Sequence, residues 1–122
     1  MEKPKPANTI LELIERKNDA WRKSAKADIT AIRLRKRGRA AEANRARERQ
    51  TRFLREACEL ESKIIRSVAA SPQEYKAKCR TLLKASFDPE DWIQIAWLLG
   101  HDAARLGLGN AMPERLREAT AG

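Results

Sequence analysis

The stretch Ile32–Gln50, IRLRKRGRAAEANRARERQ, decides whether the first half of the chain folds back on itself. Gly38 lies inside it, and between Arg33 and Arg39 only Leu34 continues the apolar stripe of the preceding residues. A lone glycine costs a helix only about 1 kcal/mol, so Gly38 by itself does not decide between a turn and a continuous helix. Because the apolar stripe is lost on both sides of it, the sequence favours a turn and predicts an antiparallel helical hairpin.

The alternative is a single helix of about sixty residues that dimerises as a coiled coil. Apolar residues at helical spacing define two arms before and after the gap. Asn8 or Thr9 is a suitable cap for the first arm. The first stripe is predicted at Ile10, Ile14, Trp21, Ala25, Ile29 and Ile32, and the second at Ala43, Ala46, Phe53, Ala57, Leu60, Ile64 and Val68.

Two further helix starts follow the hairpin. Ser71-Pro72-Gln73-Glu74 supplies a cap, a proline at the first helical position and an acid at the third, and Asp88-Pro89-Glu90-Asp91 repeats this pattern. We therefore predict helices over 72–85 and 89–106. The expected fold class is all-α: a long antiparallel helical hairpin or coiled coil followed by a small two-helix unit. The expected divisions are a disordered tail over 1–8, the basic hairpin over 9–70, the two short helices over 71–109, packed on the hairpin base, and a frayed tail over 110–122.

Composition supports this class and excludes others. Charged residues make up 35% of the chain and glycine and proline occur five times each, which favours helix. The segment MEKPKPANT has no apolar core, so it is not a secretory signal, and no stretch reaches the length of a membrane span. We therefore expect a cytoplasmic protein. Its two cysteines, Cys58 and Cys79, are expected to be reduced thiols in the core.

The net charge of +9 is concentrated in one block. Residues 16–55 carry fifteen basic and four acidic side chains, a net charge of +11, whereas the segments before and after this block each carry −1. Such an asymmetry indicates a charged partner more strongly than the total charge does.

The residues offer little for catalysis. His101 is the only histidine, and its neighbour Asp102 would not face it on a helix. The cysteines and His101 lack the spacing of metal ligands, and Gly107-Leu108-Gly109 ends a helix rather than holding a phosphate. We expect no enzyme activity, no metal and no cofactor. A helix-turn-helix is also disfavoured, because Glu90 and Asp91 would open the helix that meets DNA.

The basic block instead predicts binding to nucleic-acid phosphates, DNA or RNA, without sequence readout. The alternatives are an acidic protein partner, a membrane surface, and a merely solvated face of a coiled coil. An interaction adaptor or homodimer would use the helix at 89–106, whose predicted contact residues are Trp92, Ile93 and Trp97. The predicted phosphate contacts are Arg33, Arg35, Lys36, Arg37, Arg39, Arg45, Arg47, Arg49 and Arg52.

The second half of the chain has a recognisable pattern: ELESKIIRSVAASPQEYKAKCRTLLKA, then an acidic DW, then a helix ending HDAARLG. Over residues 56–107 it resembles a group of small, uncharacterised helical proteins of alphaproteobacterial genomes. The resemblance implies a bacterial cytosolic setting, with a mobile-element gene as one option. It implies no activity and no functional residue.

Overall fold

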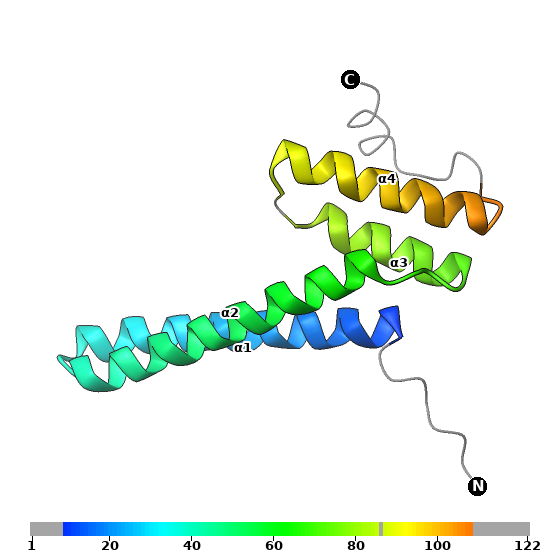
Figure 1. The fold of residues 1–122 in the computed structure, drawn as a ribbon. Coiled ribbons are helices and arrows are strands. Elements are labelled where there is room, and N and C mark those ends of the chain that lie inside the picture. Colours follow the sequence, from blue (N-terminus) through cyan, green and yellow to red (C-terminus); the bar gives the residue numbers. More distant parts are fainter. Residues whose placement is uncertain (1–8, 86, 109–122) are drawn as a thin grey trace, which may run out of the picture. The chain divides into compact units, whose positions relative to one another are not determined.

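The computed structural model describes residues 9–85 and 87–108, in which four helices and no strands are found. The first two helices run antiparallel and pack closely, and the last two pack on each other (Figure 1). This confirms the prediction of an all-α hairpin followed by a two-helix unit. The chain divides into two compact units, Glu12–Ser62 and the remainder, which are described separately. The helices are α1 (Ile10–Lys36), α2 (Ala40–Arg66), α3 (Pro72–Leu83) and α4 (Pro89–Arg105).

The chain reverses direction at Gly38, as predicted. Gly38 has φ of 74°, a left-handed conformation that residues with a Cβ rarely adopt. Its N–H donates to the carbonyl of Arg35, and the N–H of Arg39 donates to the carbonyl of Leu34. These two bonds form a Schellman motif, which satisfies carbonyls left over at the end of α1. The prediction of a hairpin, rather than one continuous helix, is therefore confirmed.

The two arms of the hairpin meet along a seam of mostly small side chains. The seam positions alternate at intervals of three and four residues, as do positions a and d of a coiled-coil heptad. We number the heptad so that Lys17 is an a position. The buried seam residues are Leu13, Lys17, Ala20, Ser24, Ala27 and Ala31 of α1, and Ala43, Ala46, Ala57 and Leu60 of α2. Gln50 and Phe53 occupy the two intervening seam positions of α2 and are half-buried.

The stripe predicted for α2 is confirmed between Ala43 and Ile64. In the stripe predicted for α1, Ile10 is buried and Ile14 half-buried, but the phase is wrong from Trp21 onward. Trp21, Ile29 and Ile32 are exposed by 45%, 49% and 42%, and Ala25 is exposed as well. The physical reason is the partner surface: alanines on α2 let the two helices approach closely, and from Ala20 to Ala31 the residues of α1 that fit against them are small. Helix α1 therefore has two rows of side chains. One row consists mostly of small residues and is buried in the seam, and the other consists mostly of bulky apolar residues and is exposed.

Polar contacts fix how the arms are aligned. The Lys17 ammonium, buried in the seam, lies 2.7 Å from the Glu61 carboxylate. Asp28 forms an ion pair with Arg47, and the ammonium of Lys23 lies 5.8 Å from the centre of the Phe53 ring. As the residue number rises along α1 from one pair to the next, the number of the partner on α2 falls by a similar amount. This is what two antiparallel helices require. A buried polar residue at a seam position also specifies the register, because any slip would leave it unpaired.

The second unit is built on α3 and α4. Ser71 caps α3 by accepting a hydrogen bond from the Glu74 N–H, and the Glu74 carboxylate accepts one from the Ala70 N–H. This confirms the predicted start of α3, whereas Asp88 at the start of α4 makes no side-chain capping bond. The core of this unit includes Ile64, Ala69, Tyr75, Cys79, Leu82, Ile95, Ala96, Leu99 and Ala103.

Two smaller predictions about burial are wrong. Val68, expected to continue the apolar stripe of the second arm, lies just beyond the end of α2 and is 62% exposed. Cys79 is buried as expected, but Cys58 is exposed, because it lies one position beyond the seam residue Ala57. The tails predicted over 1–8 and 110–122 lie outside the described residues, and the packing of the two-helix unit on the hairpin base stays a prediction.

Replacing Gly38 by Ala should destabilise the protein by about 1 kcal/mol, because a Cβ makes the left-handed conformation unfavourable. Gly100 is the matched control. It lies inside α4, and a Cβ added there meets nothing within 4 Å, so Gly100→Ala should stabilise by up to about 1 kcal/mol. Urea denaturation followed by circular dichroism measures both. A stabilising Gly38→Ala would indicate a continuous helix and contradict the turn.

Candidate functional site

Basic side chains gather on one side of the hairpin seam. The side is defined by positions c and g of the heptad, and the contact of Lys23 with Phe53 lies on it. Nine such positions run from Lys23 to Arg37 on α1 and from Glu42 to Arg52 on α2, and all nine are exposed. Thr30 is the single uncharged residue among them, and Glu42 is the single acid. We call the other seven the basic face: Lys23, Lys26, Arg33, Arg37, Arg45, Arg49 and Arg52.

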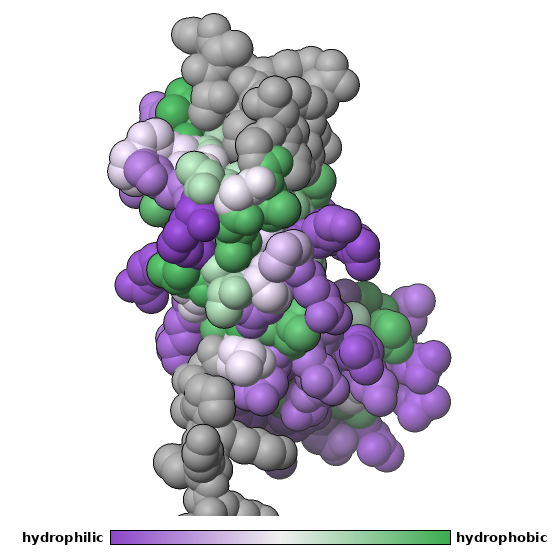
Figure 2. Space-filling model, turned by 90° about the vertical axis from the view of Figure 1, so that its right-hand side faces the viewer, coloured by the Kyte–Doolittle hydropathy of each residue, from purple (hydrophilic) through white to green (hydrophobic). Residues whose placement is uncertain are grey.

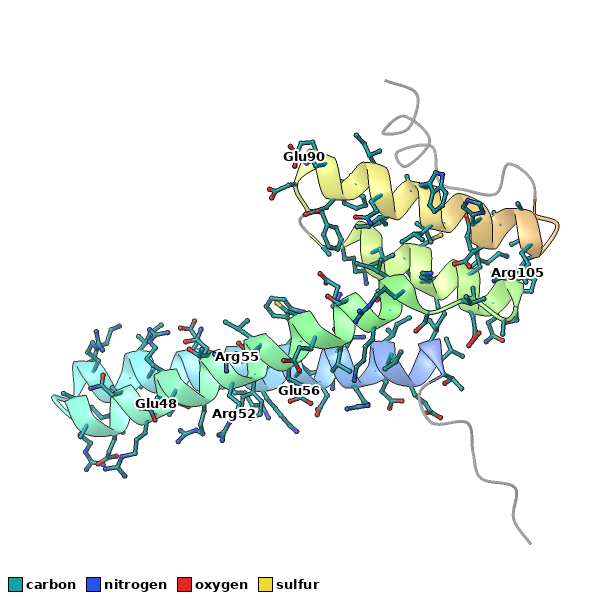
Figure 3. All side chains as sticks on the ribbon, viewed as in Figure 1. Glu48, Arg52, Arg55, Glu56, Glu90 and Arg105 are labelled. Carbon is teal, nitrogen blue, oxygen red and sulfur yellow. The ribbon has the colours of Figure 1, made fainter. Side chains whose placement is uncertain are left out.

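The side-chain view shows where this face ends on α2. Arg52 and Glu56 project from the same side of the helix (Figure 3), as their spacing of four residues requires. Glu56 and Glu59 continue the c and g positions toward the end of the hairpin away from Gly38, so the face changes sign after Arg52. The visible surface of the hairpin is mostly hydrophilic (Figure 2). The cations are therefore grouped over the half of the hairpin nearer the turn.

Five of the nine predicted phosphate contacts belong to the basic face, and four do not. Arg35, Lys36 and Arg39 are exposed around the turn, and the Arg39 guanidinium lies 3.6 Å from the Glu42 carboxylate. Arg47 lies across the seam from the basic face, where it pairs with Asp28 and donates a hydrogen bond to Gln50. Its charge is partly neutralised within the hairpin, so the structure separates Arg47 from the other predicted contacts.

Lys23 and Lys26 are members of the basic face that the sequence analysis did not select. Both lie before the run of basic residues from Arg33 to Arg52, from which the phosphate contacts were predicted. The signal that identifies them is the heptad of small residues, Ala20, Ala27 and Ala31, because it fixes which positions of α1 are c and g.

A second exposed feature lies on α4. Ile93 and Trp97, predicted as protein contacts, are exposed by 54% and 61%. The ring of Trp97 meets His101 edge-on, with centroids 4.1 Å apart. Trp92, the third predicted contact, is half-buried and packs its ring against Phe87 at 5.1 Å. Ile93 and Trp97 therefore form a small apolar surface on one side of α4, whereas Trp92 belongs partly to the core.

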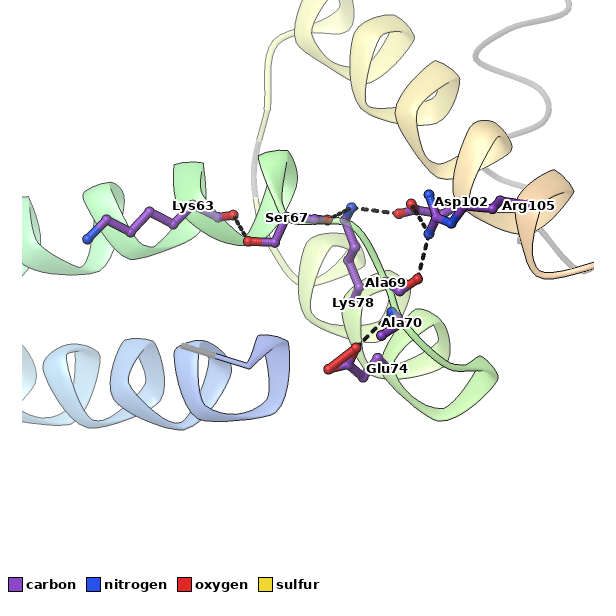
Figure 4. Close-up of polar contacts among 8 residues, drawn as sticks. All are labelled: Lys63, Ser67, Ala69, Ala70, Glu74, Lys78, Asp102 and Arg105. Carbon is purple, nitrogen blue, oxygen red and sulfur yellow. Dashed lines mark hydrogen bonds and ion pairs between the residues drawn. The ribbon is translucent and has the colours of Figure 1, made fainter. Parts of the chain in front are cut away.

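The unit of α3 and α4 also buries a pair of charges that the sequence analysis missed. The Lys78 ammonium, in a residue exposed by only 1%, lies 2.7 Å from the Asp102 carboxylate and donates to the Ser67 carbonyl at 2.7 Å (Figure 4). Asp102 also accepts a hydrogen bond from Arg105, which donates in turn to the Ala69 carbonyl. His101 is exposed while Asp102 is buried, so the two do not act together.

Beside this network lie Tyr75 and Cys79. Burial raises the pKa of the Tyr75 phenol well above its ordinary value, and the adjacent Cys79 thiol raises it further. Burial also raises the pKa of the Cys79 thiol. The Tyr75 hydroxyl has no hydrogen-bond partner of good geometry. Both groups are therefore held in their neutral forms, which disfavours a nucleophilic thiolate at Cys79.

The described residues contain neither a cluster of metal ligands nor a membrane-spanning helix. Within 9–85 and 87–108, no group of three or more histidine, cysteine or acidic side chains is placed to hold a metal ion. None of the four helices is long and apolar enough to cross a membrane. Comparisons with known protein families, curated proteins and solved structures gave no match to this chain. The basic face is thus the strongest candidate site.

Replacing Lys78 by Met should destabilise the unit of α3 and α4 by about 3 kcal/mol or more, because Asp102 then loses its buried partner. The double variant Lys78→Met/Asp102→Leu should recover most of this loss, since it leaves no unpaired charge. Lys76→Met, on an exposed position of the same helix, is the control and should change stability by less than about 0.5 kcal/mol. Chemical denaturation measures all three. Equal effects at Lys76 and Lys78 would contradict the buried pair.

Proposed function

We propose that this chain is a non-enzymatic binding protein whose basic face engages nucleic-acid phosphates without reading base sequence. The observation that carries the proposal is the grouping of seven cations and one acid, Glu42, at nine neighbouring positions on one side of the hairpin. A solvated coiled-coil surface ordinarily intersperses both signs of charge. A large excess of cations on one side instead creates a field that attracts a polyanion.

The dimensions of the face suit a phosphate backbone. Lys23 and Arg33 are ten residues apart, which corresponds to about 15 Å along a helix. A DNA duplex carries one negative charge per about 1.7 Å of its axis, so a segment of that length presents about nine phosphates. Five of the seven cations are arginines, whose planar guanidinium groups bind phosphate oxygens in pairs.

The side chains also indicate which nucleic acids are preferred. Phe53, the aromatic residue beside this face, is half-buried and has Lys23 and Arg52 against its ring. It is therefore poorly placed to stack on an unpaired base, as single-strand binding proteins require. Contacts from long basic side chains to the backbone favour duplex DNA or structured RNA, in the cytoplasm, without sequence preference.

The proposal predicts a steep salt dependence of binding. With about seven phosphate contacts, the logarithm of the binding constant should fall against the logarithm of salt concentration with a slope of about −6 on B-DNA. The triple variant Arg45→Glu/Arg49→Glu/Arg52→Glu should weaken binding strongly and reduce the slope by about 3. Fluorescence anisotropy with a labelled duplex, repeated with scrambled sequences and a structured RNA, measures both quantities.

The matched control is Lys76→Glu/Arg80→Glu/Lys84→Glu. It makes the same change in net charge at exposed residues of α3 and its C-cap, and it should weaken binding far less than the hairpin variant. Circular dichroism of both variants checks that they are folded. Equal losses in the two variants would show a general charge effect and contradict the basic face. Absence of binding at physiological salt would reject the proposal.

The second candidate is an interaction adaptor that uses α4. It is favoured by the exposure of Ile93 and Trp97, two large apolar side chains on adjacent turns of one helix. Aromatic anchors of this kind contribute much of the binding energy in protein interfaces. Replacing Trp97 by Ala would abolish such binding and leave phosphate binding intact, so this variant separates the two functions in a pull-down from cell lysate.

A further inference from the structure

The hairpin has a second exposed surface that phosphate binding does not use. We call it the apolar face, and it consists of Trp21, Ala25, Ile29 and Ile32 of α1. These residues recur at intervals of four, four and three, so they lie along one side of the helix. The basic face of α1 lies on a different side of the same helix, and the seam lies on a third.

We infer that the apolar face joins two copies of this chain, with the two α1 helices antiparallel. The inference does not rest on nucleic-acid binding, because it concerns different residues. Apolar side chains at helical spacing beside an existing seam are the pattern by which two hairpins form a four-helix bundle. In this arrangement the two basic faces point away from the interface and remain open.

The order of residues on α1 fits a two-fold axis near Ala25. In an interface with two-fold symmetry, every contact occurs twice. If one residue of the first copy contacts a second residue of the partner, the same second residue of the first copy contacts the first residue of the partner. An axis at Ala25 places Trp21 against the partner's Ile29 and Ile32, and the partner's Trp21 against Ile29 and Ile32. The small side chain of Ala25 meets its own copy at the centre, where it lets the helices approach closely.

The charges of the hairpin select the antiparallel arrangement. Residues 21–55, in the half of the hairpin that includes the turn, carry thirteen basic and three acidic side chains. Residues 12–20 and 56–62, at the other end, together carry two basic and six acidic ones. An antiparallel pair places each basic end beside the partner's more acidic end, whereas a parallel pair would place two strongly basic ends together. This complementarity favours a second copy over a basic or neutral partner.

One ion pair at the edge of the interface follows from the same axis. Glu15 and Lys36 are both exposed and occupy the same heptad position. Glu15 lies ten residues before Ala25, and Lys36 lies eleven residues after it. In antiparallel two-fold packing, equal heptad positions face each other across the interface. Glu15 therefore lies beside the partner's Lys36, and this contact occurs twice in the dimer.

Sedimentation equilibrium over a range of protein concentrations tests the association. The wild-type chain should reach twice the mass of one chain, and Trp21→Glu/Ile32→Glu should remain a monomer with unchanged helix content. The control Arg45→Glu/Arg49→Glu/Arg52→Glu, on the basic face, should still dimerise. A wild-type monomer at all concentrations would overturn the inference. So would a dimer that survives Trp21→Glu/Ile32→Glu, including one that is lost instead in Ile93→Glu/Trp97→Glu on α4.

Cysteine cross-linking tests the orientation, in a Cys58→Ser background that removes the exposed native thiol. Ala25→Cys should form a covalent dimer on oxidation, while Thr30→Cys, on the side of the basic face, should not. A mixture of Glu15→Cys chains and Lys36→Cys chains should cross-link to each other, and neither should cross-link to itself. Self-linking of Glu15→Cys would indicate a parallel pair and overturn the proposed orientation.

Charge exchange supplies a readout that a merely destabilised interface would not give. Glu15→Lys should weaken dimerisation because it opposes the partner's Lys36, and Lys36→Glu should weaken it because it opposes the partner's Glu15. Glu15→Lys/Lys36→Glu should restore the dimer, since it exchanges the two charges. If the double variant is weaker than either single variant, the ion pair and the position of the axis are wrong.

Discussion

The close approach of α1 and α2 along a seam of small side chains is the constraint on which the hairpin depends. Gly38 allows the chain to reverse, but the reversal alone does not decide which sides of the helices meet. Alanines such as Ala27 and Ala31 on α1, and Ala43 and Ala46 on α2, make that choice, because helices pack closest where side chains are smallest. Once the seam is fixed, every other residue of the hairpin is assigned to a side. The separation of the basic face from the apolar face is a consequence of that assignment.

The sequence was sufficient to predict features set by local chemistry. The turn at Gly38 and the start of α3 after Ser71 depend on backbone conformations and caps within a few residues. Ile93 and Trp97 were selected as contact residues because they lie off the apolar face of α4, and both are exposed. Such features do not require knowledge of what lies across the core.

The sequence was not sufficient where the answer depended on a distant partner. Trp21, Ile29 and Ile32 are large apolar residues of α1 at helical spacing, and ranking by hydrophobicity selects them for the seam. Their exclusion depends on the small residues of α2, which are remote in sequence. Lys78 was missed for the same reason: nothing near it indicates that Asp102, twenty-four residues later, lies within 2.7 Å. Lys23 and Lys26 were omitted from the candidate site because the predicted contacts followed the run of basic residues from Arg33 to Arg52 along the sequence.

The buried Lys78–Asp102 pair has a structural explanation that does not require a catalytic role. Two apolar side chains of similar volume could match its contribution to stability, since desolvation offsets much of the attraction between buried charges. An apolar pair could not, however, donate to the Ser67 and Ala69 carbonyls, which the network satisfies through Lys78 and Arg105. Those carbonyls belong to the connection between α2 and α3. The charges therefore specify how that connection packs against α3 and α4, and a small unit with few large core residues gains a defined arrangement from directional bonds.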